Sequence, residues 1–128
     1  MKKLLAMTAL AFLSTAALAT PAAAWTEIAR RIVTDRMDLD VVPLPGWRRF
    51  DEIKLCVKRN PVRFVDVDVY FANGGHQDIS IRTRINPGGC TRNIDLRGYD
   101  RNITSIKLLY EETSWGPRKT ATVVLWGR

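Results

Sequence analysis

Apolar and polar residues alternate along most of this 128-residue chain, and turn-forming residues interrupt the alternation about every ten positions. Successive side chains of a β-strand point to opposite faces, so this alternation is typical of strands that bury one face. It predicts about eight short strands, at residues 28–36, 37–42, 50–58, 62–73, 77–85, 91–96, 102–111 and 119–126. Helical periodicity is nearly absent. We therefore expect an all-β fold, a single antiparallel β-sandwich in preference to a small barrel or an α/β fold.

Two of the predicted strands carry further signals. In the fourth strand the apolar parity changes between Phe64 and Val65, which predicts a β-bulge or a strand covered on both faces. Asn73-Gly74-Gly75 follows, and because these residues tolerate positive φ they predict a hairpin into the strand at 77–85. In the last strand, Trp126 has the parity of a core residue, and a place in a sugar-binding cleft is the alternative role for a tryptophan.

Residues 1–24 have the form of a bacterial secretory signal peptide. A lysine pair precedes an apolar, uncharged run over 4–19, and three alanines ending at Ala24 make a site of the kind that signal peptidase accepts. The apolar run has about 15 residues, fewer than the roughly 20 that span a bilayer. We expect cleavage near Ala24, or else after Ala19, which leaves one periplasmic or secreted domain at 25–128 without a transmembrane segment.

Both cysteines, Cys56 and Cys90, lie in the part of the chain that we expect to be exported. An oxidising compartment favours their pairing in a disulfide. Such a bond closes a loop of about 35 residues and stabilises the fold by roughly 3–4 kcal/mol in the chain-entropy model. The alternative is two separate thiols, one packed on a strand and the other in a loop.

Basic residues outnumber acidic ones, 20 against 13, and without the two leader lysines the net charge falls from +7 to +5. Most of these cations are arginines, whose planar fork suits carboxylate, phosphate or sulfate groups. Arg82 and Arg84 share a face of one predicted strand, and the candidate anion-binding face consists of Arg82, Arg84, Arg92, Arg97 and Arg101. The alternatives are arginines paired with nearby aspartates in solvent, and a structural corner around 94–101.

Metal and catalytic sites have weak support in the sequence. One histidine and two distant cysteines do not make a zinc ligand set, so we expect no metal and no cofactor. Two carboxylate groups offer oxygens of the type that Ca²⁺ takes, Asp35/Asp38/Asp40 and Asp66/Asp68, but without the spacing of a calcium loop solvated carboxylates are the expected state. The chain has no G-x-S-x-G elbow and no Gly-rich phosphate loop, so we name no catalytic residue and expect no enzyme.

Several short motifs together resemble a family of small exported bacterial proteins of unknown function. They are Asp38-Leu39-Asp40-Val41, Ile53-Lys54-Leu55-Cys56-Val57, Val69-Tyr70-Phe71-Ala72-Asn73-Gly74, Gln77-Asp78-Ile79, Ile94-Asp95-Leu96-Arg97-Gly98 and the closing 121–128. The resemblance spans nearly the whole of the domain. It implies an exported β-sandwich and brings with it no activity and no catalytic residue.

These observations favour an exported, non-enzymatic domain that acts by binding or as a structural accessory in the cell envelope. The alternative is an anion-binding module for envelope polysaccharide or lipopolysaccharide, and a small secreted hydrolase comes third. The expected partner is an anionic envelope polymer or another envelope protein, and nucleic acid is not an expected partner.

Overall fold

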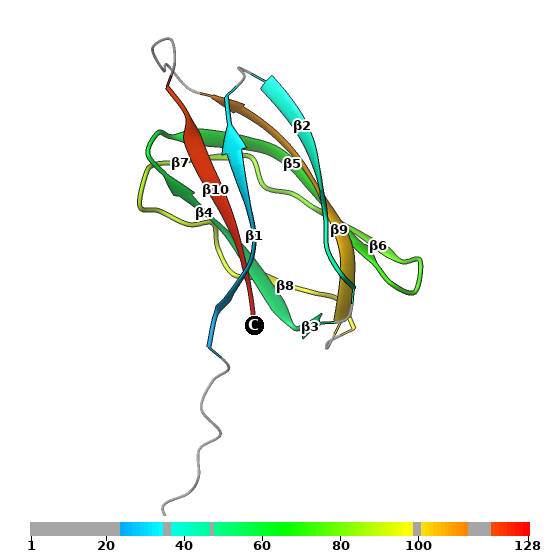
Figure 1. The fold of residues 1–128 in the computed structure, drawn as a ribbon. Helices are drawn as coiled ribbons and strands as arrows, with labels where there is room; N and C mark the ends of the chain where they lie inside the picture. Colours follow the sequence, from blue (N-terminus) through cyan, green and yellow to red (C-terminus); the bar gives the residue numbers. More distant parts are fainter. Residues whose placement is uncertain (1–23, 35–36, 47, 99–100, 113–118) are drawn as a thin grey trace, which may run out of the picture.

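The computed structural model describes residues 24–34, 37–46, 48–98, 101–112 and 119–128, with the backbone alone at 37, 38 and 112. These residues form strands and turns. The strands are β1 (Thr26–Val33), β2 (Met37–Pro43), β3 (Arg49–Phe50), β4 (Glu52–Lys58), β5 (Val62–Phe71), β6 (His76–Ile79), β7 (Thr83–Ile85), β8 (Ile94–Asp95), β9 (Arg101–Glu112) and β10 (Ala121–Gly127). They make two antiparallel sheets that face each other (Figure 1), so the predicted all-β sandwich is confirmed.

One sheet has the strand order β1-β10-β4-β8. Thr26 lies opposite Gly127 in the pairing of β1 with β10, so the first and last described strands run side by side in opposite directions. β10 pairs along nearly its whole length with β4, and β8 adds a short pairing at the start of β4. β4 therefore has a partner on each side over its first residues, and the disulfide loop described below lies beside the rest.

The other sheet has the order β2-β9-β5-β6, with β3 on β9 and β7 on β5. The predicted bulge in β5 is present, because the register with β9 shifts between Phe64 and Asp66. Phe64 and Val67 are buried on either side of this shift, while Val65 is only half-buried. One extra residue thus allows β5 to keep apolar side chains in the core along its whole length.

The core lies between the two sheets. Alternate residues of the central strands have no exposed surface, or nearly none, as the one-sided alternation predicts: Ile53, Leu55 and Val57 of β4, Phe64, Val67 and Val69 of β5, Ile106, Leu108 and Tyr110 of β9, Val123 and Leu125 of β10. The hairpin at Asn73-Gly74-Gly75 also forms, with Gly74 at φ +88°, a conformation that glycine adopts without a steric penalty.

Three sequence predictions are wrong in detail. The strand expected at 50–58 is divided, because Phe50 belongs to β3, which pairs with β9 in the other sheet, and β4 begins at Glu52. The strand expected at 77–85 is two strands, β6 and β7, because three residues at 80–82 face only two on β5 between the paired segments, and this mismatch interrupts the ladder.

Trp126 does not point into the core. Its neighbours on β10, Leu125 and Gly127, are buried, and Trp126 is half-buried on the outer face of the four-stranded sheet.

Candidate functional site

The five arginines of the predicted anion-binding face do not form one surface patch. Arg82 and Arg92 line the same depression, which has a volume of about 340 Å³. Arg82 lies in the segment between β6 and β7, so it does not share a strand with Arg84 as expected. Arg84 is in β7 opposite Arg63, whose guanidinium lies 3.5 Å from the carboxylate of Glu111.

Arg97 and Arg101 belong to a different part of the molecule, the corner before β9. The guanidinium of Arg101 donates to the backbone carbonyl of Arg97 and, at 3.2 Å, to the Asn73 side chain. It also stacks on the ring of Phe71, 3.7 Å from the ring centroid. These contacts tie the corner to the β5–β6 hairpin, which favours the structural-corner alternative for this segment. At Gly98, φ is +91° and an added Cβ would lie 3.0 Å from Arg101.

Gln77 is a second component of the same corner that the sequence analysis did not identify. Its side chain is 7% exposed and bridges two backbone groups of the facing segment. The amide nitrogen donates to the carbonyl of Asp95 at 3.0 Å, and the amide oxygen accepts from the N–H of Arg97 at 2.8 Å. The sequence shows only a glutamine at the start of a predicted strand, and neither its burial nor its bridge could be predicted from that.

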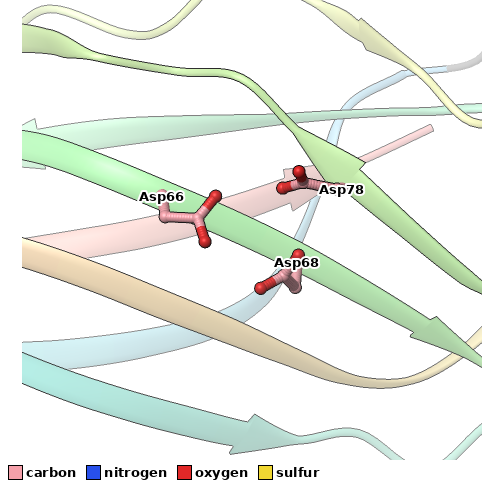
Figure 2. Close-up of side chains that lie close together, drawn as sticks. All are labelled: Asp66, Asp68 and Asp78. Atoms are coloured by element: carbon pink, nitrogen blue, oxygen red, sulfur yellow. The ribbon is translucent and has the colours of Figure 1, made fainter.

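A third aspartate joins the carboxylates that the sequence placed on one face of β5. Figure 2 shows Asp66 and Asp68 of β5 with Asp78 of β6, and their oxygens lie within 4.8 Å of one another. Two of the three carboxylates already have partners. Asp68 lies 3.0 Å from the imidazole of His76, and Asp66 accepts from the backbone N–H of Val67 at 3.0 Å. The cluster therefore offers carboxylate oxygens of the kind that bind Ca²⁺, but three carboxylates offering one oxygen each do not fill the coordination shell of that ion.

The other acidic set proposed from the sequence, Asp35/Asp38/Asp40, is described only in part, because Asp35 and the side chain of Asp38 lie outside the described residues. Asp40 accepts a hydrogen bond from the hydroxyl of Tyr110, a fully buried side chain of β9. This contact gives Asp40 a structural partner at one edge of the sandwich.

The two cysteines are paired in a disulfide, which resolves the alternative that the sequence left open. Cys56 of β4 and Cys90 of the loop before β8 have an S–S distance of 1.99 Å and a Cα–Cα distance of 4.0 Å. Backbone hydrogen bonds hold the loop against β4 on both sides of the bond, from Gly88 to Val57 and from Thr91 to Leu55, both at 2.8 Å. Cys56 has outward parity and is 9% exposed, because the loop covers it.

An apolar groove lies next to this disulfide on the outer face of the four-stranded sheet. It has a volume of about 330 Å³, and both cysteines contribute to its lining. Trp25, which immediately precedes β1, and Trp126 of β10 supply aromatic rings, and Lys54 and Lys58 of β4 supply cations. In the β10–β4 register, Trp126 pairs with Lys54. From the sequence, the parity of Trp126 is that of a core residue, with a sugar-binding cleft as the alternative, and the groove itself was not predicted.

Cations surround the aromatic end of the groove. The Lys54 ammonium lies 4.4 Å and the Arg128 guanidinium 4.5 Å from the Trp25 ring centroid, both within the range of cation–π attraction. Arg128 is also held by Glu52, with a nitrogen–oxygen distance of 2.8 Å. On β1, Glu27 lies opposite Trp126 and is also paired with an arginine.

That arginine is Arg30, whose guanidinium lies 2.6 Å from a carboxylate oxygen of Glu27. The hydrogen bond from Arg30 lowers the pKa of Glu27 below its usual value of 4.5, and the same contact raises the pKa of Arg30. Both acidic side chains near the aromatic end, Glu27 and Glu52, are therefore matched by an arginine. Lys54 and Lys58 are the cations that line the groove itself, and the charge of Lys58 also contributes to the lowered pKa of Glu27.

Within the described residues, no helix is long and apolar enough to cross a bilayer. Among curated proteins, none matches the chain. A solved structure with a similar backbone is that of AlgX from Pseudomonas aeruginosa, with a TM-score of 0.47 and 13% sequence identity, covering 80% of this chain and 26% of that chain. The family model for a domain of unknown function, DUF2541, matches residues 4–127. The chain therefore belongs to the DUF2541 family.

Proposed function

We propose that this protein is an exported accessory domain that acts by binding in the cell envelope and has no catalytic role. The observation that carries the proposal is the Cys56–Cys90 disulfide, because such bonds form and persist in oxidising compartments. The leader-like sequence at 1–24 supports the same location.

The cysteines and the histidine, which are common catalytic residues, have structural contacts in this fold, and this supports a role in binding. Both cysteine sulfurs are in the disulfide, so neither cysteine is a free thiol nucleophile. The single histidine, His76, lies on the exposed edge strand β6, where its imidazole stacks on Tyr70 with a centroid distance of 4.9 Å. A hydrogen bond between its Nε2 and the Asp68 carboxylate, 3.0 Å long, also holds the ring. These contacts give His76 a packing role on a sheet surface.

Cell fractionation tests the proposal directly. The full chain and a variant lacking residues 2–24 are expressed in a bacterium with an outer membrane, and each fraction is treated with a maleimide reagent with and without prior reduction. We expect the full chain in the periplasm or medium, with both cysteines labelled only after reduction. The variant without the leader should stay in the cytoplasm with free thiols. A full-length chain found in the cytoplasm with reactive thiols would refute export.

An anion-binding module remains the second candidate function, and the depression shared by Arg82 and Arg92 favours it. Two guanidinium groups beside one concave surface suit a sulfate or phosphate group of an envelope polymer. Replacing both by serine should shorten retention on heparin, whereas the double lysine variant should retain most of it. Unchanged retention of the serine variant would eliminate this face as the anion site.

A further inference from the structure

We propose that the groove between Trp25, Trp126 and the Cys56–Cys90 disulfide binds an acidic oligosaccharide, with a sugar ring packed on Trp126 and its carboxylates held by Lys54 and Lys58. The choice of a saccharide as the ligand rests on the proposed envelope location. The site lies on the outer face of the four-stranded sheet, apart from the aspartate cluster, and it adjoins the arginine depression, with which it shares Cys90.

The floor of the groove is suited to a sugar ring. One face of a pyranose carries axial C–H groups, which pack on a flat indole and are attracted by the negative face of its π-system. Trp126 is half-buried, so its position is held by the sheet while part of its surface stays accessible. The Cys56–Cys90 disulfide extends the apolar surface beside it. The covalent bond also fixes the loop wall, so the groove exists before a ligand arrives.

Lys54 and Lys58 lie beside the groove, where the carboxylates of a bound oligosaccharide would be. Lys54 and Lys58 are both on the outward face of β4, four residues apart, which places their Cα atoms about 13 Å apart along the strand. Both lysines line the groove, and a lysine side chain can pack its methylene stem on an apolar surface while its ammonium group stays in water. Trp25 holds the first ammonium in place through the cation–π contact. The two charges thus flank the groove rather than block it.

The position of β4 within the sheet argues against a peptide as the ligand. A peptide that adds to a sheet needs an edge strand with free backbone groups. β4 lies between β10 and β8 in the sheet order, and the disulfide loop bonds to its backbone at Leu55 and Val57. Recognition at this site must therefore come from side chains, and those present are indole rings and ammonium groups.

Titration of the purified protein with a hexamer of galacturonic acid, followed by tryptophan fluorescence and calorimetry, tests the proposal. The matched ligand is the methyl ester of the same hexamer, which keeps the sugar rings and removes the charges. We expect the acid to bind at least about tenfold more tightly than the ester, because the ester has no negative charge to pair with the lysine ammonium groups. Failure of the acid hexamer to bind would overturn the proposal.

Matched variants separate this site from general attraction between charges. K54Q/K58Q should weaken binding of the acid by at least about tenfold, whereas R63Q/K107Q, which removes the same charge from the six-stranded sheet, should change it by less than about twofold. W126A should lose binding and W126F retain it; if W126A does not fold, the lysine variants decide. Equal weakening by the two charge variants, or equal affinity for single-stranded oligothymidylate, would refute the saccharide site. Export is measured separately by fractionation, so the two proposals fail independently.

Discussion

Removal of the disulfide by the double substitution C56A/C90A opens a loop with a sequence separation of 34 residues. In the chain-entropy model a loop of this length contributes about 4 kcal/mol of stability at 25 °C, because the open chain gains freedom when unfolded. The folded state should change little. The hydrogen bonds that join Gly88 and Gly89 to Val57, 2.8 to 3.0 Å long, still hold the loop on β4. Alanine suits the buried position of Cys56, which is 9% exposed.

Urea denaturation of the oxidised protein, the double variant and the reduced wild-type protein measures this contribution. A loss of about 4 kcal/mol corresponds to a fall in Tm of roughly 20 °C for a domain of about 100 residues. The m-value should rise in the variant, because an unfolded chain without the cross-link exposes more surface. The reduced wild-type protein is the control and should match the variant. A loss below about 1 kcal/mol in both proteins would refute the loop-entropy argument.

Substitutions at three further positions test other parts of the fold. Gly127→Ala places a Cβ 2.7 Å from the ring of Phe50 and should cost about 1–3 kcal/mol in urea denaturation, so an unchanged midpoint would contradict the packing described. Gln77→Leu leaves two backbone groups without their partner and should cost about 1–3 kcal/mol, whereas Gln77→Glu at low pH should cost less. The lowered pKa of Glu27 makes its pair with Arg30 stabilising above pH 4.5, and this contribution is lost as pH falls through the lowered value. NMR titration should show that the substitution Arg30→Ala returns the pKa of Glu27 toward 4.5. If the pKa of Glu27 is the same in the variant as in the wild-type protein, the pair does not form in solution.

The strands could be predicted from the sequence where one face alone is buried. The alternation in β4, with Ile53 and Leu55 inward, fixed both the strand and its orientation, and the parity change after Phe64 identified the bulge in β5. The interruption at 80–82 could not be predicted, because it depends on how many residues of another strand lie opposite. Local periodicity contains no information about that count.

The outer-face groove was missed for a related reason. Trp126 and Leu125 are adjacent and apolar, so the pattern alone does not say which of them points inward. A residue's parity shows which residues share its face, and only the packing of the two sheets shows which face is buried. The predicted arginine face had a different weakness, because it grouped residues by their closeness in the sequence. Arg82 and Arg101 are near each other in sequence, but the fold assigns them to different depressions.

The pairing of Thr26 with Gly127 determines how the domain responds to a pulling force. A load applied at these two residues meets the hydrogen bonds between β1 and β10 one pair at a time, so these strands should separate at low force. As long as the disulfide is intact, the segment between Cys56 and Cys90 cannot extend. Its 34-residue separation corresponds to about 115 Å of contour length, and the oxidised chain is shorter by that amount when fully extended. In an atomic-force pulling trace, reductant should release that length as one additional step.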